Sequence, residues 1–285
     1  IDADILLGTD PDADRVGVGV KDNHGNWVLL NGNQTAVLAF NYMIEARRKK
    51  GLSKDNDMVV KTIVTTDLID IISARNEIKC YNVLTGFKWI AELIKSKEAN
   101  ENYIIGGEES YGLMIGDQLR DKDAVSAVAF LCEMAAYEKD AGKSLFTKLV
   151  DLYLEYGLFR EHLISITKKG RDGQAQIAAM MDQFRNNPPS TLAGIPVIGL
   201  YDYDKKEAKD LTNGQVCAID LPRSNVLQFV LEDGSKISAR PSGTEPKIKF
   251  YFSVQGKLER VEDFDTAYAS LGDKINVIIA ELGLA

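Results

Sequence analysis

The sequence is poor in cysteine, and the cysteines it has do not form any recognisable pair. Only three occur in 285 residues, at positions 80, 132 and 217, and none belongs to a C-x-x-C pair. A small, odd and scattered set excludes a disulfide framework and a thiolate zinc site. We therefore expect reduced thiols and a cytoplasmic location.

Long apolar runs and basic blocks are also missing. No apolar run approaches the roughly 18 residues that a membrane helix needs, so no membrane partner is expected. The longest basic block is only residues 47–50 and the net charge is -8, which argues against a nucleic-acid partner. No G-x-x-x-x-G-K-[ST] loop is present, which argues against an ATP-hydrolysing protein.

What the chain does contain is typical of a globular protein of about two domains. Hydrophobic residues make up 45% of it and charged residues 27%. Residues 1–4 lead almost at once into the apolar residues 5–7, which we interpret as a buried strand. We therefore expect that the chain begins inside a domain.

The middle of the chain alternates between strand-like and helix-like segments. This is the β-α-β-α-β pattern of a parallel sheet, in which ligands bind beyond the carboxyl ends of the strands. Three loops follow the expected strands, at residues 65–67, 85–88 and 106–112, and should border one cleft. The expected strands are residues 58–64, 81–84 and 103–105, and the expected helices are residues 68–76 and 87–97.

The remaining segments frame this alternation. Before it we expect a strand at residues 5–7, an acidic loop, a strand at 16–20 and a helix from 35 to 50. After it comes a long helix at 124–139. Beyond residue 157 the pattern becomes antiparallel and predicts an α+β domain. That domain should hold a strand at 159–167, a helix at 174–184, several short strands and a helix at 261–282.

The acidic loop at residues 8–15, Gly-Thr-Asp-Pro-Asp-Ala-Asp-Arg, is the most informative stretch. Residues two apart project to the same side of extended backbone, so Asp10, Asp12 and Asp14 can converge. Like charges about 4 Å apart cost about 4 kcal/mol per pair at an effective dielectric near 20, which a bound cation would reverse. Oxygen ligands alone favour Mg²⁺. The simpler alternative is a solvated acidic turn.

Two other chemistries could use the same acidic loop. An EF-hand calcium loop starting at Asp10 would need Gly at its sixth position and Glu at its twelfth, where this chain has Arg15 and Lys21. A phosphatase with an aspartyl nucleophile also places Asp-x-Asp after an apolar strand, as Asp10 and Asp12 do here. Such enzymes usually continue with Thr where this chain has Asp14, so that hypothesis is weaker but stays open.

Two further loops carry binding chemistry. Residues 107–112, Gly-Glu-Glu-Ser-Tyr-Gly, bring two carboxylates and a hydroxyl to a strand end, where they could accept hydrogen bonds from sugar hydroxyls. Residues 240–247, Arg-Pro-Ser-Gly-Thr-Glu-Pro-Lys, could direct backbone N–H groups, hydroxyls and a guanidinium at a phosphate. For each, a plain turn is the alternative.

With these three loops in this order, the chain resembles the α-D-phosphohexomutases, the phosphoglucomutase/phosphomannomutase family, over nearly its whole length. Each motif alone is moderately specific, and the three in order are highly specific. The resemblance implies an α/β fold: parallel-sheet mutase-type domains followed by a C-terminal α+β domain with an antiparallel sheet. It also implies three parts, namely the end of a metal-binding second domain at 1–33, a sugar-binding domain at 34–156 and a phosphate-binding domain at 157–285.

The resemblance further implies an activity, the Mg²⁺-dependent interconversion of hexose 1-phosphate and hexose 6-phosphate. The reaction would pass through a phosphoserine enzyme and a hexose bisphosphate. The resemblance assigns roles to residues by matching motifs. These are Asp10, Asp12 and Asp14 for the metal; Arg15, Lys122 and Lys88 for catalysis; Glu108 and Ser110 for the sugar hydroxyls; Thr85 and Gly86 for the substrate; and Arg240, Ser242, Gly243 and Thr244 for the phosphate that does not react.

The chain departs from the family in lacking its nucleophile, a Ser followed by His. The sequence has no Ser-His pair, and its histidines, His24 and His162, are expected in a turn and a strand. The resemblance thus implies that N-terminal domains of the same protein are missing and that this chain alone is inactive. A third, non-enzymatic hypothesis is a sugar-phosphate-binding module. The sequence leaves glucose, mannose and pentose phosphates open as substrates.

Overall fold

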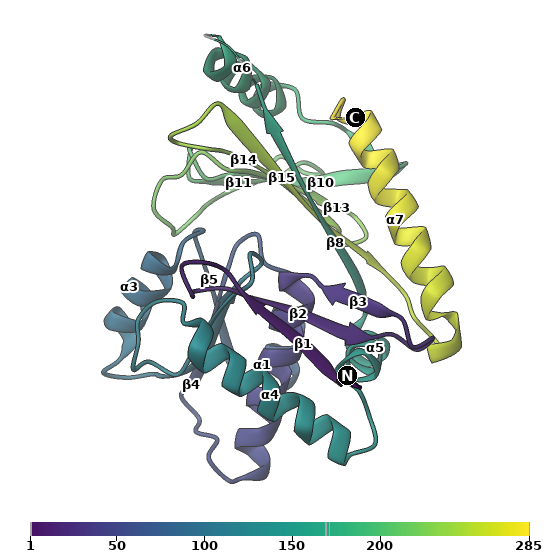
Figure 1. The fold of residues 1–285 in the computed structure, drawn as a ribbon. Coiled ribbons are helices and arrows are strands. Elements are labelled where there is room, and N and C mark those ends of the chain that lie inside the picture. Colours follow the sequence, from purple (N-terminus) through teal and green to yellow (C-terminus); the bar gives the residue numbers. More distant parts are fainter. Residues whose placement is uncertain (1, 169, 171, 285) are drawn as a thin grey trace. The chain divides into compact units, whose positions relative to one another are not determined.

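The computed structural model divides the chain into two compact units, Ile1–Gly157 and Leu158–Ala285 (Figure 1). The structure describes residues 2–168, 170 and 172–284. The expectation about the start of the chain at Ile1 therefore lies outside the described residues. The division into 1–33, 34–156 and 157–285 stays a prediction, and residues 1–33 fall within the first unit here. Among the described residues, no helix is long and apolar enough to cross a membrane.

The acidic loop belongs to a three-stranded antiparallel sheet of the first unit. Its strands are β1 (Ile5–Thr9), β2 (Val16–Lys21) and β3 (Trp27–Leu30), in the order β1-β2-β3. The expectation that β1 is buried was wrong: Leu6 is 50% exposed, because it lies on the same, exposed face of this sheet as Leu29, which is 83% exposed. The core residues come from β2, where Val16, Val18 and Val20 are buried.

A second, four-stranded sheet of the first unit has the order β5-β4-β6-β7. Strand β4 (Asp57–Thr62) is parallel to β5 (Lys79–Val83) and β6 (Asn102–Glu108), as the alternating pattern predicts. Helices α2 (Leu68–Arg75) and α3 (Phe87–Lys97) connect these strands. Strand β7 (Gly112–Ile115) was not predicted, and it returns antiparallel to β6. Residues 107–112, the expected sugar-binding segment, therefore form the hairpin turn between β6 and β7 together with the strand ends that flank it.

Three longer helices complete the first unit: α1 (Gly32–Lys49), α4 (Ala124–Asp140) and α5 (Leu145–Tyr156). The start of α1 is fixed by a capping box, in which Asn31 and Gln34 bond each other's backbone N–H groups. The start of α4 is fixed by Asp123, whose carboxylate accepts from the backbone N–H groups of Val125 and Ser126. Helix α5 was not predicted. These caps set where the loops before α1 and α4 end.

The second unit is built on an eight-stranded antiparallel sheet, as the pattern beyond residue 157 predicts. Its strand order is β12-β11-β10-β13-β14-β15-β8, and β9 pairs with β10. The strands are β8 (Leu158–Thr167), β9 (Thr191–Leu192), β10 (Ile195–Asp202), β11 (Glu207–Asp210), β12 (Val216–Ala218), β13 (Leu227–Leu231), β14 (Lys236–Pro241) and β15 (Lys247–Gly256).

Two helices cover one face of this sheet, α6 (Gly173–Asn186) and α7 (Phe264–Glu281), the second preceded by a 3-10 turn, η1 (Val261–Asp263) (Figure 1). Phe184 of α6 packs edge-on against Phe250 at 6.0 Å between ring centroids. Leu271 of α7 lies against Gly256, where an added Cβ would come within 3.0 Å of it. Positions 250 and 256 share one face of β15, so both helices lie on that face.

Candidate functional site

The acidic loop between β1 and β2 folds back on its own first carboxylate. Asp10 Oδ1 accepts from the backbone N–H groups of Asp14 and Arg15, each at 3.1 Å, and Asp10 Oδ2 accepts from Arg15 Nη1 at 3.2 Å. Burial alone would raise the pKa of Asp10, but these hydrogen bonds outweigh it and lower the pKa. Both oxygens are therefore engaged, which does not favour Asp10 as the nucleophile of a phosphatase.

Asp14 is bound to a lysine from a distant part of the sequence. Lys122 Nζ lies 3.1 Å from Asp14 Oδ2 and 3.0 Å from Asp121 Oδ1. The same ammonium group lies 4.9 Å from the centroid of the Phe87 ring, and the Lys122 side chain is only 14% exposed. Burial acts to lower the pKa of Lys122, but the hydrogen bonds to Asp121 and Asp14 outweigh it and raise the pKa. Lys122 is thus a cation in this site.

The acidic loop carries the oxygen ligands that a hard cation prefers, but its side chains are not arranged as a metal site. In the part of the chain that is described, no group of three or more His, Cys, Asp and Glu side chains is placed to hold a metal ion. Asp10 and Asp14 are instead each paired with a cation, Arg15 and Lys122. Asp14 Oδ1 is nevertheless buried and accepts no hydrogen bond from a described group. A buried carboxylate oxygen of this kind fits a hard cation.

The hairpin turn between β6 and β7 carries the expected sugar-binding residues. Glu108 is 6% exposed, and its Oε1 accepts from the backbone N–H of Gly86 at 2.6 Å. Burial raises the pKa of Glu108, and the neighbouring Glu109 adds to the shift. Ser110 is half-buried in the turn. Gly86 has φ +117°, a backbone conformation that favours glycine.

Further contacts join this hairpin turn to the acidic loop. The backbone N–H of Val16 donates to the carbonyl of Tyr111 at 3.2 Å, and that of Ala124 donates to the carbonyl of Ala13 at 3.0 Å. Gly112 lies so close to Lys122 that an added Cβ would come within 2.7 Å of its Cδ. The structure therefore brings together the acidic loop, the Thr85-Gly86 loop, the hairpin turn and Lys122, all within the first unit.

Thr85 and Lys88, two of the expected site residues, differ in how closely they belong to this site. The Thr85 hydroxyl is buried and has no hydrogen-bond partner among the described residues, so it is available to a ligand. Lys88 is exposed, and its Nζ lies 4.7 Å from the centroid of the Trp89 ring. Of the two lysines, Lys122 is the one that contacts the acidic loop.

Sequence reasoning missed several residues beneath the hairpin turn. Glu109 Oε2 accepts from the hydroxyls of Thr62 and Thr65, at 3.2 and 3.3 Å. Lys61 is fully buried at the end of β4 and contacts Asp67 and Asp70. The available signal was the run of polar residues at the carboxyl end of β4, which placed residues 65–67 at the cleft but left out positions 61 and 62.

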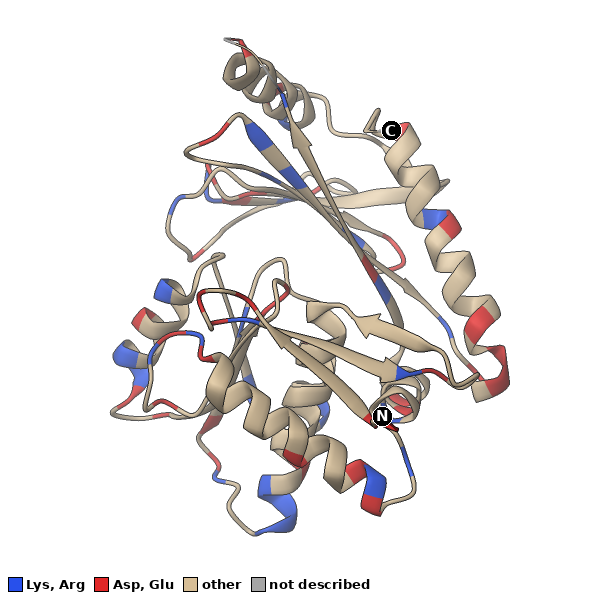
Figure 2. Cartoon of the chain, viewed as in Figure 1, with Lys and Arg blue, Asp and Glu red and all other residues tan. Residues whose placement is uncertain are grey.

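The expected phosphate loop joins β14 to β15 in the second unit. Arg240 pairs with Lys249 across the two strands, so both side chains lie on the sheet face opposite the helices. Figure 2 shows Lys and Arg on these strands. Arg240 Nη1 lies 3.5 Å from the Tyr251 hydroxyl. Positive charge is thus concentrated beside the loop.

The backbone of this phosphate loop differs from the expectation. Its N–H groups were expected to be directed at an anion. In the structure the N–H groups of Thr244 and Glu245 donate to Ser242 Oγ, both at 3.3 Å. The hydroxyl of a Ser two or three residues earlier satisfies them locally, a common turn geometry. Gly243 and Thr244 are exposed at the tip of the loop.

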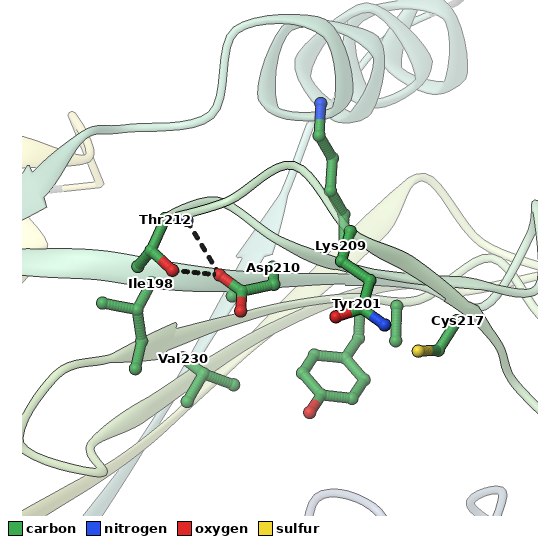
Figure 3. Close-up of a pocket in the computed structure, with 10 residues that line it drawn as sticks. Ile198, Tyr201, Lys209, Asp210, Thr212, Cys217 and Val230 are labelled. Carbon is green, nitrogen blue, oxygen red and sulfur yellow. Dashed lines mark hydrogen bonds between the residues drawn. The ribbon is translucent and has the colours of Figure 1, made fainter.

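A separate cavity of about 360 Å³ lies on the second unit's sheet (Figure 3). Asp210 there accepts from the Thr212 backbone N–H at 2.8 Å and hydroxyl at 2.6 Å, which stabilises a turn. Figure 3 shows Lys209 extending away from Tyr201 and Val230. The cavity therefore offers an apolar wall rather than a phosphate site. Its lining is Ile198, Gly199, Tyr201, Ala208, Lys209, Asp210, Thr212, Gln215, Cys217 and Val230.

Comparisons with known proteins identify relatives of this chain. Residues 31–156 match the family model described as "Phosphoglucomutase/phosphomannomutase, alpha/beta/alpha domain III". The chain belongs to the phosphoglucomutase/phosphomannomutase family. It is 38% identical over 275 residues to a phosphoglucomutase of Staphylococcus epidermidis, and 37% identical over 277 residues to one of Staphylococcus aureus. These matches cover 96% and 97% of this chain but 48% of each relative.

Solved structures of the family share the fold. The open form of the phosphoglucomutase pp63/parafusin from Paramecium superposes with a TM-score of 0.66 at 20% identity, over 99% of this chain and 45% of that one. A phosphoglucomutase/phosphomannomutase family protein from Burkholderia thailandensis gives a TM-score of 0.60 at 15% identity, over 99% and 48%. The chain thus spans about half the length of its relatives, which agrees with a C-terminal portion of such a protein.

Proposed function

We propose that this chain is the sugar-binding and phosphate-binding portion of a phosphohexomutase. The whole protein would interconvert hexose 1-phosphate and hexose 6-phosphate through a phosphoserine and a bisphosphorylated sugar. Support comes from the sequence similarity to two phosphoglucomutases, which are 38% and 37% identical to this chain over 96% and 97% of its length. The observation that carries the proposal is the hydrogen-bonded assembly in the first unit, where Glu108 meets Gly86 and Lys122 meets Asp14.

In this proposal the hairpin turn recognises the sugar. The carboxylate of Glu108 and the hydroxyl of Ser110 accept hydrogen bonds from neighbouring sugar hydroxyls, and the buried Thr85 hydroxyl and the Gly86 backbone line the same place. A carboxylate acceptor makes hydrogen bonds about twice as strong as a neutral one. Burial raises the pKa of Glu108. The same burial strengthens a hydrogen bond to its carboxylate, because a buried carboxylate gains more from a donor than an exposed one does.

The acidic loop serves the phosphoryl group in this proposal. Asp10, Asp12 and Asp14 would hold Mg²⁺, which when bound neutralises charge on the phosphoryl oxygens. Arg15 and Lys122 add positive charge beside Asp14, where a phosphoryl oxygen can be stabilised. Because its pKa is raised, Lys122 keeps its proton in this site, which favours a role as a fixed cation rather than as a base or a proton donor. Lys88 remains the second lysine candidate.

The loop between β14 and β15 serves the phosphate that does not react. Arg240 would form the charged contact, with Ser242, Gly243 and Thr244 around it and Lys249 adding to the local positive charge. The exposed loop tip leaves room for an oxyanion to replace Ser242 as the acceptor of the Thr244 N–H. The planar fork of an Arg side chain matches phosphate oxygens.

Catalysis by this chain alone is not expected, because it holds no Ser-His pair. The proposed partners are the N-terminal domains of the same protein, together with hexose monophosphate and bisphosphate. Purified residues 1–285 should not convert glucose 1-phosphate to glucose 6-phosphate in the presence of Mg²⁺. Turnover at an ordinary enzymatic rate would show that this part of the proposal is wrong.

Calorimetry tests the binding part of the proposal. Residues 1–285 should bind glucose 1-phosphate, and Arg240→Ala should weaken binding about tenfold or more, since a charged hydrogen bond contributes about 1.5–3 kcal/mol. Lys209→Ala is the matched control, because it removes a cation of the same unit outside the phosphate loop. The proposal fails if glucose 1-phosphate does not bind or if both variants bind as the parent chain does.

A further inference from the structure

Glu109 lies between the two expected sugar-binding residues but has a different environment. Its Oε2 accepts from the hydroxyls of Thr62 and Thr65, and those hydroxyls lie 2.9 Å from each other. Thr62 and Thr65 are both fully buried at the carboxyl end of β4. The carboxylate of Glu109 is therefore held at the end of the central parallel strand of its sheet.

The two threonines are themselves fixed from below. Lys61 Nζ is fully buried and donates to the carbonyl of Thr65 at 3.2 Å, while it pairs with Asp67 at 3.2 Å and with Asp70 at 2.8 Å. A buried ammonium group needs all of these partners, so the backbone at Thr65 cannot move without breaking them. The donors that hold Glu109 thus sit on a rigid support.

The backbone of the turn is held on its other side. An added Cβ at Gly32 would lie 2.0 Å from the Glu109 carbonyl oxygen, so the start of α1 presses directly on the turn. The Tyr111 carbonyl accepts from the N–H of Val16 at the start of β2. Glu109 is therefore the point at which the turn is bound to β4, to α1 and, through Tyr111, to the acidic loop.

We propose that Glu109 is a positioning residue, which fixes the turn so that its neighbours meet the sugar. This inference rests on the proposed function, because it takes Glu108 and Ser110 as the groups that contact the sugar. Hexose phosphates that differ only at carbon 4 present that hydroxyl in different directions. Acceptors distinguish them only if held at fixed places, so the hydrogen bonds that Thr62 and Thr65 donate to Glu109 determine selectivity.

Amide hydrogen exchange tests the positioning role without any ligand. The variant Thr62→Val with Thr65→Val keeps the side-chain shape but removes both donors to Glu109. The backbone N–H of Gly86, which donates to Glu108, and that of Val16 should then exchange at least tenfold faster. Amides of the β4–β5 pairing should keep their rates. The matched control, Thr62→Ser with Thr65→Ser, keeps both donors and should leave Gly86 and Val16 protected.

Calorimetry of the same variants tests the consequence for selectivity. The parent chain should prefer glucose 1-phosphate to galactose 1-phosphate, its epimer at carbon 4. The valine variant should lose most of this preference yet bind inorganic phosphate as before, and the serine variant should retain it. Unchanged exchange in the valine variant would overturn the inference. So would faster exchange with unchanged preference, or weaker sugar binding with unchanged exchange, which would make Glu109 a direct ligand.

The two experiments also separate this inference from the function on which it rests. If the parent chain binds no hexose phosphate, the proposed function fails and the selectivity claim fails with it. The exchange result would still decide whether Glu109 fixes the turn. If the parent chain binds and discriminates while the valine variant does the same, only the positioning role is wrong.

Discussion

At the residue scale, the environment of Glu108 predicts how stability changes with pH. Burial, followed by the charge of Glu109, raises the pKa of Glu108 above its unfolded value of about 4.3. The folded state therefore keeps a proton that the unfolded state has lost. Stability from this group is present below the unfolded pKa and is lost as the pH rises through the folded pKa. Ionised Glu108 thus costs stability at pH 7.

Replacing Glu108 by Gln removes the ionisation and keeps an oxygen for the Gly86 N–H. The variant should gain stability relative to the parent chain as pH rises from 4 to 7, as measured by urea unfolding at both values. Glu45→Gln is a control of opposite sign, because hydrogen bonds from Asn41 and Lys148 outweigh burial and lower the pKa of Glu45. That variant should lose relative stability over the same range. If the relative stability of both variants changed in the same direction between pH 4 and 7, the opposite pKa shifts of Glu108 and Glu45 would be contradicted.

At the element scale, the close approach of α1 to the hairpin turn predicts the effect of a single methyl group. Gly32→Ala places a Cβ 2.0 Å from the Glu109 carbonyl oxygen, so backbone must move against backbone. Overpacking of this kind costs about 1–3 kcal/mol. Gly8→Ala is the matched control, because no heavy atom lies within 4 Å of its added Cβ. Chemical denaturation should show that Gly32→Ala is less stable than Gly8→Ala. Equal stabilities would show that the hairpin turn moves to make room for the added methyl group.

The elements that the sequence predicted are those with a clear period. The β-α-β-α-β alternation gave the parallel strands, because each buried strand is bounded by polar residues and each helix repeats its apolar face. Strand β7 was missed because Gly112–Ile115 is short and follows the hairpin turn directly. The predicted burial of β1 was wrong because residues 5–7 are apolar on both faces, and only the fold shows that the face carrying Leu6 and Leu29 is exposed. An apolar run does not report which face of a sheet is left exposed.

At the scale of the whole molecule, the sequence located the loops but not their pairings. Motif spacing placed Asp14, Glu108 and Lys122 among the candidates, because loops at the carboxyl ends of parallel strands gather at one edge. The ion pair between Lys122 and Asp14 joins residues more than a hundred positions apart and follows from the packing of α4 against the first sheet. Lys61 was missed because a lysine within a strand ordinarily faces solvent. Only the fold brings Asp67 and Asp70 to it.

The division into two units predicts two separable folding reactions. Helix α5 ends at Tyr156 and β8 begins at Leu158, so one residue joins the units. Phe40 in the first unit and Phe250 in the second are both fully buried. Residues 158–285 produced alone should fold cooperatively, and calorimetry of the whole chain should show two transitions.

Substitutions in the two cores then identify the transitions. Phe250→Ala should lower the temperature of the transition that the isolated residues 158–285 also show, because it removes about 3–5 kcal/mol of stability. Phe40→Ala should lower the temperature of the other transition for the same reason. Each variant is the control for the other, because both remove the same buried ring. A single transition that either substitution shifts would mean that the units fold together, since coupling between them would then exceed the stability of each alone.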